Sequence, residues 1–165
     1  MKSAALTGAN RMVEANPLAE VWLHAETGEH SLHAAQSYTV NQIITAFSAA
    51  TTLSYPTYLT VQTDIHQHIT LQPSYLQYVN HSCAPNVFFD TTRMELIALT
   101  NIEVGDEMTF FYPSTEWNMQ QPFSCRCGSR NCLKTIKGAA HLPVSRLKKY
   151  RLSDFVIRQL NLPAR

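Results

Sequence analysis

The sequence predicts a mainly β protein, a β-rich α+β fold built from small sheets in a single domain. Short segments rich in β-forming residues follow one another as far as residue 112. Their spacing is irregular and no long helical pattern separates them, which argues against a βαβ architecture. A length of 165 residues allows one substantial core, and 45% hydrophobic with 15% charged residues is typical of a globular protein. The net charge of +1 offers no general support for nucleic-acid or membrane binding.

The strand predictions follow from local patterns, taken in chain order. Residues 1–20 show no clear period and are expected to form an arm or a first strand. Enrichment in β-formers or period-two alternation then predicts strands over residues 41–47, 57–62, 65–71, 86–90 and 94–100. The last two flank the short segment Thr-Thr-Arg and are expected to pair as a hairpin. A Gly-Asp turn within residues 101–112 precedes one more strand.

The C-terminal segment predicts a helix over residues 145–163. Ser153 is a candidate N-cap inside this segment, and Pro163 follows its last apolar residue. The apolar face of the helix is expected to consist of Phe155, Val156, Leu160 and Leu162. A helix here adds the α component at the end of an otherwise β-rich chain.

The expected location is inside the cell, either cytoplasmic or nuclear. No stretch of the chain approaches the roughly 18 apolar residues of a membrane span. The N-terminus carries a single lysine and only a short apolar run, unlike a signal peptide. Thiols stay reduced in such a compartment, which bears on how the cysteines are interpreted.

Four cysteines predict a zinc site. Cys125, Cys127 and Cys132 have the spacing C-x-C-x4-C in a polar, glycine-containing segment, as thiolate ligands often do. Three thiolates leave a tetrahedral ion one ligand short, and Cys83 is the cysteine that remains. Two alternatives stay open: a pair of disulfides if the chain were secreted, or unrelated buried thiols. The zinc interpretation predicts that the C-terminal part folds back over Cys83.

Four motifs in a fixed order resemble those of a known family. They are Asn-His-Ser-Cys at residues 80–83, Pro-Asn at 85–86, Gly-Asp-Glu-Met-Thr-Phe-Phe-Tyr at 105–112, and C-x-C-G-x3-C at 125–132. Together they resemble the SET-domain protein lysine methyltransferases that carry a post-SET zinc module. The resemblance extends over about residues 22–138, which is most of the chain.

The resemblance implies a SET fold of small curled sheets with a knot-like crossing, where the segment around Cys83 meets the segment ending at Tyr112. It also implies a C-terminal post-SET module in which the same four cysteines bind zinc. The expected division is an N-terminal arm at 1–20, a SET domain at 21–117, a post-SET zinc-binding module at 118–140 and a C-terminal helical tail at 141–165.

By the same resemblance, residues of the motifs acquire expected roles. Asn80 and the backbone of His81 are expected to contact the cofactor S-adenosylmethionine, and Tyr112 is the expected catalytic tyrosine. Phe110 matches a position where phenylalanine leaves more room than tyrosine, which favours the addition of more than one methyl group. Phe47 matches a second catalytic-site tyrosine of the family and lacks its hydroxyl.

Two further aromatic residues lie between Tyr112 and the cysteine cluster. Trp117 and Phe123 are each expected either to line a substrate channel or to pack in the core. A narrow aromatic channel suits the chemistry, because methyl transfer from a sulfonium to an amine depends on alignment and desolvation. Aromatic faces also tolerate the cation that develops on the amine.

One stretch departs from the family pattern at the expected cofactor site. The family has Gly-x-Gly where this chain has Glu29, His30 and Ser31, and Gly28 lies one residue too early to replace the first glycine. Glycines let a backbone approach a ligand closely. If the Cβ atoms of Glu29 and Ser31 point away from the pocket, S-adenosylmethionine fits; if they point inward, they crowd it. Glu29 could also meet the positive charge of the cofactor.

The sequence supports three classes of function. The first is S-adenosylmethionine-dependent methyl transfer to a lysine side chain of a protein. The second is a SET scaffold used for a small molecule, by methylation or by a non-methylating reaction such as cyclisation. Only about thirty residues separate residue 47 from residue 79, so the wall of a peptide groove would be short. The third is a catalytically silent binding module. No membrane partner and no direct nucleic-acid binding are expected.

Overall fold

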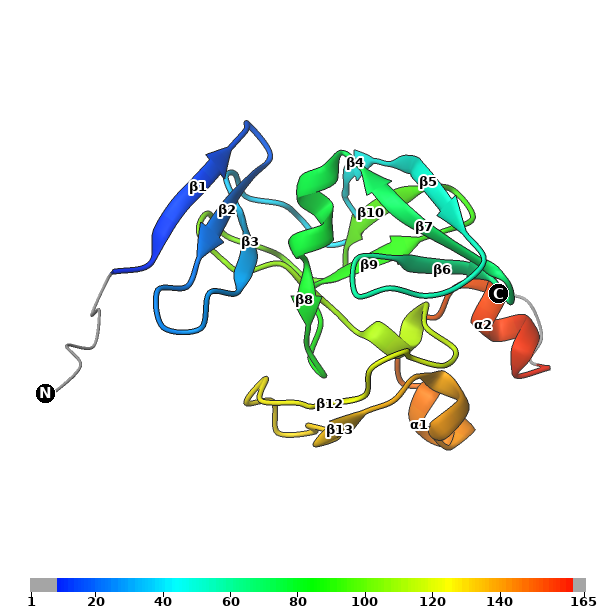
Figure 1. Ribbon diagram of the computed structural model, residues 1–165. Coiled ribbons are helices and arrows are strands. Elements are labelled where there is room, and N and C mark those ends of the chain that lie inside the picture. Colours follow the sequence, from blue (N-terminus) through cyan, green and yellow to red (C-terminus); the bar gives the residue numbers. More distant parts are fainter. Residues whose placement is uncertain (1–8, 162–165) are drawn as a thin grey trace, which may run out of the picture.

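The computed structural model describes residues 9–161 and is mainly β, as predicted. The strands of this part of the chain form three sheets of three strands and two of two strands, so that no sheet is wide (Figure 1). Helical structure is limited to short 3-10 turns and two short α-helices near the C-terminus. The fold class therefore agrees with the sequence.

The N-terminal sheet is an antiparallel meander of three strands, β1 (Arg11–Ala15), β2 (Ala19–Leu23) and β3 (His30–Ala34). A strand therefore lies within the region predicted as an arm or a first strand, although residues 1–8 fall outside the described range. Strand β1 is exposed along its whole length, whereas β3 buries Leu32 completely. Gly28 has φ +71° in the β2–β3 loop, a left-handed conformation that favours glycine.

Two further sheets make up the centre of the molecule. One has the order β4-β10-β9, formed by β4 (Ile43–Ala46), β9 (Val87–Asp90) and β10 (Glu95–Ala98). Its antiparallel β9–β10 pair, with Leu96 opposite Phe89, confirms the predicted hairpin. The other has the order β5-β7-β6, formed by β5 (Ser48–Leu53), β6 (Val61–Asp64) and β7 (Gln67–Gln72).

The expected meeting of two distant segments is confirmed at the middle of the fold. After the 3-10 helix η1 (Ser74–Tyr78), strand β8 (Asn80–His81) pairs in parallel with β11 (Thr109–Phe110). The pairing continues beyond the strands, because the Ser82 amide donates to the Phe110 carbonyl at 3.0 Å. The side chain of Asn86 accepts from the Thr109 amide at 2.8 Å and locks the crossing further.

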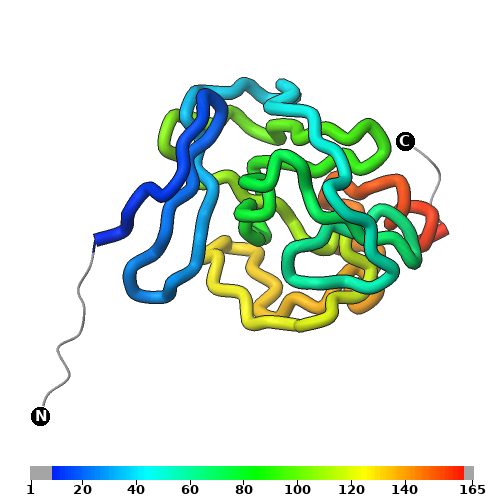
Figure 2. The backbone as a smooth tube through the Cα atoms, turned by 45° about the horizontal axis from the view of Figure 1, so that its top comes forward, coloured from blue at the N-terminus to red at the C-terminus, as the bar shows by residue number. Residues whose placement is uncertain are grey.

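The C-terminal part runs along one side of this β-rich body (Figure 2). It contains the 3-10 helix η2 (Tyr112–Ser114), strands β12 (Phe123–Ser124) and β13 (Thr135–Ile136), the 3-10 helix η3 (Ala139–His141), α1 (Val144–Leu147) and α2 (Asp154–Gln159). Strands β12 and β13 form an antiparallel ribbon below β8 in Figure 1.

The prediction of one helix over residues 145–163 is wrong, because two short helices are separated by an extended segment. Ser153 has φ −66° and ψ 154°, so the chain is extended where the single helix would continue. The N-cap prediction for Ser153 is confirmed, since its hydroxyl accepts from the Val156 amide at 3.3 Å. Phe155 and Val156 are buried and Leu160 is half-buried, whereas Leu162 and Pro163 lie outside the described residues.

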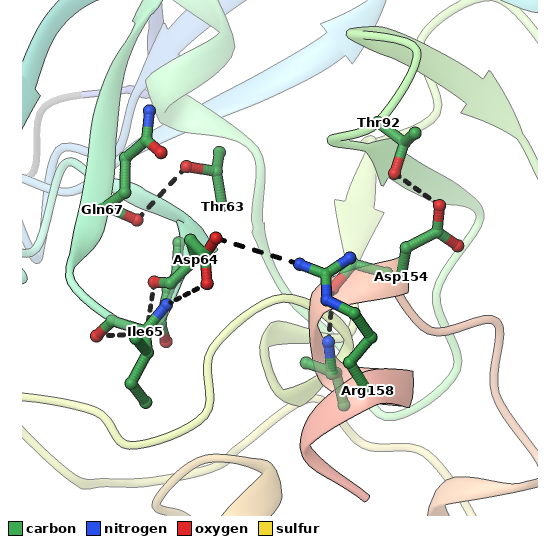
Figure 3. Close-up of polar contacts among 10 residues, drawn as sticks. Thr63, Asp64, Ile65, Gln67, Thr92, Asp154 and Arg158 are labelled. Atoms are coloured by element: carbon green, nitrogen blue, oxygen red, sulfur yellow. Dashed lines mark hydrogen bonds and ion pairs between the residues drawn. The ribbon is translucent and has the colours of Figure 1, made fainter. Parts of the chain in front are cut away.

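Helix α2 is fastened to two turns of the central sheets, as Figure 3 shows. Thr92, in the β9–β10 turn, donates its hydroxyl to Asp154 at 2.7 Å. Arg158 reaches Asp64 at the end of β6 with an N–O separation of 4.0 Å. Both partners of this ion pair are more than half exposed, so solvent screening leaves it a weak contribution to stability. The buried face of α2 therefore supplies most of the attachment.

Candidate active site and metal centre

Four cysteine side chains converge on one point between β8 and the β12–β13 ribbon. The Sγ atoms of Cys83, Cys125, Cys127 and Cys132 all lie within 4.8 Å of one another, and those of Cys83 and Cys125 are 3.9 Å apart. A tetrahedral zinc ion with bonds of about 2.3 Å would place its sulfur atoms about 3.8 Å apart. The cluster therefore has the ligand set and the spacing of a structural zinc site, and it ties the C-terminal part to β8.

The protonation of these thiols is coupled to metal binding. Burial raises the pKa of Cys83 to about 12 and that of Cys125 to about 11. A bound metal ion deprotonates the thiols that coordinate it, so zinc would replace these protons. Backbone amides are already directed at the cluster, since Leu133 donates to Cys83 Sγ at 3.4 Å and Lys134 to Cys132 Sγ at 3.5 Å. Such donors stabilise thiolates.

A continuous row of aromatic rings connects the central core to the cysteine cluster. Ring centroids are 5.5 Å apart for Phe47 and Phe89, 4.8 Å for Phe89 and Phe110, 4.7 Å for Phe110 and Tyr112, and 5.9 Å for Tyr112 and Phe123. The structure thus brings together four of the predicted site residues, and Phe89 is a member that sequence reasoning missed. The row offers apolar surroundings, and its contacts are edge-on except for the tilted Phe110–Tyr112 pair.

Trp117 is not part of this row. Its side chain packs against the buried cluster formed by the C-terminal helices, which includes Phe111 and Phe155. This placement favours core packing among the two roles expected for it. Phe123 instead contacts both Tyr112 and the cysteine cluster, which favours the channel-wall role.

Tyr112 is the first residue of η2, two positions after the end of β11, and three glutamates act on it. Burial raises the pKa of its hydroxyl, and the nearby carboxylates of Glu116, Glu107 and Glu29 raise it further. The phenol is therefore neutral, and any positive charge that enters this region gains favourable electrostatic interactions. These are properties that a pocket for a cationic cofactor or an amine requires.

Asn80 and His81, on β8, join the surrounding segments. Asn80 Nδ2 donates to the His30 carbonyl at 2.9 Å and to Glu107 at 3.1 Å, which connects β3 to the crossing. His81 Nδ1 accepts from the Tyr112 amide at 3.1 Å, and its Nε2 lies 3.3 Å from Cys83 Sγ. Burial lowers the pKa of His81 to about 4, so the ring is neutral at physiological pH.

Comparison with known families explains this arrangement. The SET domain family matches residues 11–113, which is more than half of the chain. The chain belongs to the SET domain family. The match includes β8, β11 and Tyr112 and ends before the cysteines at 125–132, so the zinc module rests on the geometry of the cluster.

Several curated SET proteins are similar to this chain. Methyltransferase flvH of Aspergillus flavus is 48% identical over 102 residues, covering 61% of this chain and 57% of that protein. A histone-lysine N-methyltransferase of Debaryomyces hansenii, H3 lysine-36 specific, is 37% identical over 76 residues, or 42% of this chain and 10% of that protein. The chain therefore spans little more than half of the first relative and a small part of the second.

A solved structure shares the SET fold. The crystal structure of KRYPTONITE in complex with mCHG DNA and SAH superposes with a TM-score of 0.51 at 22% identity, covering 71% of this chain and 28% of that chain. At this identity the likeness concerns the fold alone. Within residues 9–161, no helix combines the length and the apolar character that crossing a membrane requires.

Strand β3 of this SET domain accommodates side chains where the family has glycines. Ser31 Oγ lies 2.9 Å from His33 Nε2, and His33 Nδ1 lies 2.8 Å from the Gly105 carbonyl. Because a carbonyl only accepts, Nδ1 donates to it and Nε2 accepts from the serine hydroxyl. Ser31 and His33 thus share the face of β3 opposite Leu32, which packs in the core cluster that Tyr112 joins. The Cβ of Ser31 points away from that cluster.

Glu29 and His30 precede Ser31 in the segment that differs from the family's Gly-x-Gly. Glu29 is exposed beside β3, and His30 stacks on Tyr78 with ring centroids 4.7 Å apart. Their arrangement leaves the carboxylate of Glu29 near enough to Tyr112 to raise the pKa of its hydroxyl. The acidic side chains near Tyr112, Glu29 among them, suit the positively charged sulfur of S-adenosylmethionine.

Sequence reasoning missed Glu116, which is a buried acid next to the site. Its carboxylate accepts from the Gln62 amide at 2.8 Å and from the Thr115 hydroxyl at 3.1 Å. Neither of the two ion pairs found among residues 9–161 involves it, and burial raises its pKa to about 7. One glutamate in a polar segment gives no signal of burial in the sequence.

Tyr150 is a second missed residue. Its hydroxyl donates to the Cys83 carbonyl at 2.9 Å, and its ring stacks on Phe111 with centroids 3.7 Å apart. The only hint in the sequence that Tyr150 packs against the fold is that an aromatic residue interrupts the basic run at 145–151.

Two surface hollows lie away from the aromatic row. One of about 330 Å³ is at β13 and η3, and the other, of about 340 Å³, is beside α2.

Proposed function

We propose that this SET domain transfers a methyl group from S-adenosylmethionine to an amine nitrogen, and that its substrate is a lysine side chain of a protein. The observation that carries the proposal is the position of Tyr112 at the β8–β11 crossing. There its ring lies between Phe110 and Phe123 in the aromatic row, and nearby carboxylates raise the pKa of its hydroxyl. This combination suits a neutral phenol that orients an amine beside a cation.

Asn80, the backbone of His81 and the start of β3 are the groups proposed to hold the cofactor. When bound, S-adenosylmethionine supplies an electrophilic methyl carbon on a positively charged sulfur. The carboxylates of Glu29 and Glu107 favour that charge, and Ser31 leaves the site clear because its hydroxyl is engaged by His33.

The protein's own contribution is orientation and exclusion of water. The Tyr112 hydroxyl oxygen accepts a hydrogen bond from an N–H of the neutral substrate amine, which leaves the nitrogen lone pair free to point at the methyl carbon. The apolar rings of Phe47, Phe110 and Phe123 remove water and face the developing cation. A phenylalanine at 110 leaves room for a nitrogen that already carries a methyl group, which favours repeated transfer.

A small-molecule amine is the second candidate substrate. The relative with 48% identity is named only as a methyltransferase, whereas the relative named for histone lysine is 37% identical over a shorter stretch. The sheet β5-β7-β6 is also small, and its edge strand β5 is almost wholly exposed. A short wall offers little surface to an extended peptide.

An intracellular location, cytoplasmic or nuclear, belongs to the same proposal because thiols stay reduced, and so available as metal ligands, inside the cell.

A labelling experiment tests the proposal and separates its two substrates. Zinc-loaded protein is incubated with methyl-labelled S-adenosylmethionine and either lysine-containing proteins, histones included, or a panel of small primary and secondary amines. Label on protein lysines, absent in Tyr112→Phe, supports the first substrate. Label confined to small amines moves the assignment to the second. Label on neither, with no turnover of the cofactor, contradicts methyl transfer.

A further inference from the structure

The side chain of His81 touches both the metal centre and the segment that carries Tyr112. Its Nε2 lies 3.3 Å from Cys83 Sγ, and its Nδ1 lies 3.1 Å from the Tyr112 backbone nitrogen. We propose that His81 is a positioning residue that couples the four-cysteine metal centre to Tyr112. The inference rests on the proposed function for the importance of Tyr112, but its geometry stands without it.

The hydrogen bonds fix the tautomer of the ring. A backbone amide only donates, so His81 Nδ1 must accept from Tyr112 and carries no proton. A neutral imidazole has one ring proton, which therefore lies on Nε2 and is directed at Cys83 Sγ. The contact between Nε2 and Cys83 Sγ at 3.3 Å therefore links the position of Cys83 to the orientation of the ring.

Packing prevents the ring from turning to other partners. The His81 ring has Phe111, Tyr112 and Phe123 around it, with centroids 5.8, 5.1 and 5.7 Å away. Its backbone is held by the parallel pairing with Phe110. A ring confined on three sides transmits a displacement of Cys83 to the Tyr112 amide.

The coupling is useful because Tyr112 stands where strand β11 changes into η2. Its amide lies at the start of η2, two residues after the β8–β11 pairing ends, and it donates to His81 Nδ1. On the metal side, Cys83 Sγ accepts from both His81 Nε2 and the Leu133 amide at 3.4 Å. Hydrogen bonds of this kind to metal ligands tune affinity, and their loss commonly costs about 10–100-fold.

Two substitutions separate the two hydrogen bonds. In His81→Asn the amide oxygen can replace Nδ1 and accept from Tyr112, but the side chain is too short for Cys83. In His81→Gln the amide group can replace Nε2 and donate to Cys83, but the acceptor for Tyr112 is lost. His141→Gln is the matched control, because the side chain of this exposed histidine hydrogen-bonds Asn118 at 2.8 Å and is bonded to neither Cys83 nor Tyr112.

Two readouts need neither cofactor nor substrate. The first is the sulfur-to-metal charge-transfer band of the cobalt-substituted protein together with zinc affinity. The second is the amide resonance of Tyr112 in protein labelled with ¹⁵N-tyrosine. We expect His81→Asn to shift the band and weaken zinc by about tenfold while the Tyr112 resonance stays near its parent position. We expect His81→Gln to leave the charge-transfer band and the zinc affinity near those of the parent and to shift the Tyr112 resonance. This variant should also lower kcat more than it changes KM.

The outcomes are decisive in each direction. Equal effects of both variants on both readouts, or a band that neither variant moves, would overturn the coupling. If the variants fail to fold, the parent protein still tests it. Replacing zinc by the larger cadmium ion should move the Tyr112 amide and the His81 ring nitrogens, and unchanged resonances would contradict the proposal. A protein that passes these tests yet transfers no methyl group would contradict only the proposed function.

Discussion

Tyr112 is the residue whose hydroxyl the proposed chemistry needs most. Tyr112→Phe removes one oxygen, and the ring retains its contacts with Phe110, Phe123 and His81. We expect the melting temperature to stay near that of the parent. Methyl-transfer activity should fall by about two to three orders of magnitude, the usual effect of one positioned polar group at a reacting centre. A phenylalanine variant as active as the parent would show that another residue orients the substrate.

Glu116 makes the stability of the protein depend on pH. Its pKa rises from 4.5 in the unfolded chain to about 7 in the fold because of burial, so folding favours the protonated acid. Stability therefore falls as pH rises from about 4.5 to about 7, and stays lower above that range. Glu116→Gln keeps an acceptor for the Gln62 amide and removes the charge. Urea unfolding at pH 8 should show the variant more stable by about 1–3 kcal/mol.

The comparison at low pH completes this test. At pH 4 the parent acid is protonated and the two proteins should have similar stability. The exposed Glu26→Gln serves as the control and should show no such pH dependence. A variant that is less stable than the parent at both pH values would mean that the Glu116 charge is satisfied in the fold.

At the scale of single residues, chemistry with a sequence signature could be predicted and burial could not. The cysteine spacing and the motif ending at Tyr112 led to residues that the fold brings close together. Phe89 and Glu116 were missed because nothing local distinguishes a phenylalanine of the site from one of the core, or a buried glutamate from a solvated one. The direction of the Ser31 side chain also needed the structure, since it depends on the phase of β3.

Strand β3 supplies a prediction about the cofactor site. The Cβ of Ser31 points away from the core cluster, so Ser31→Gly should change the affinity for S-adenosylmethionine by less than about threefold, or roughly 0.6 kcal/mol. Ser31→Ala, which keeps Cβ but loses the contact with His33, is the control. Titration calorimetry of both variants measures the effect. Binding at least about tenfold tighter in the glycine variant would mean that the serine crowds the cofactor.

The β12–β13 ribbon depends on the metal centre for its attachment. Cys83→Ser removes a ligand from the cluster while the central sheets keep their own pairing. We expect residues 120–140 to lose amide-exchange protection and the zinc content to fall, because metal binding is coupled to folding. Amide protection of the β9–β10 hairpin should remain. Unchanged protection of the ribbon in the metal-depleted variant would contradict the expected role of the metal.

The type of each helix or strand was predicted better than its first and last residues. Enrichment in β-formers located β4, and two strand-like segments flanking Thr-Thr-Arg predicted the β9–β10 hairpin. The strand expected at 57–62 begins at Val61 because Thr57 and Thr60 form a turn. The expected C-terminal helix was interrupted because a strong N-cap at Ser153 starts a new helix. The meeting of the segments that contain β8 and β11 followed from the family resemblance, whereas their parallel pairing was not predicted, since two-residue strands leave no pattern of their own.

For the whole molecule, Tyr112 is the point where separate hydrophobic clusters meet. It packs against the central core and also against the cysteine cluster, while its neighbour Phe111 belongs to the C-terminal cluster. Tyr150 reinforces the junction through its bond to the Cys83 carbonyl. The C-terminal part is therefore built into the candidate site, and changes in it are expected to reach Tyr112.

The central claim, that this SET domain uses S-adenosylmethionine, is tested most directly by isothermal titration of the zinc-loaded protein with that cofactor. The direction of Ser31 and the carboxylates that surround Tyr112 lead us to expect one site per chain with a Kd of about 1–100 μM. The absence of detectable binding at millimolar cofactor would contradict the account of the site, although the fold and the four-cysteine cluster would stand.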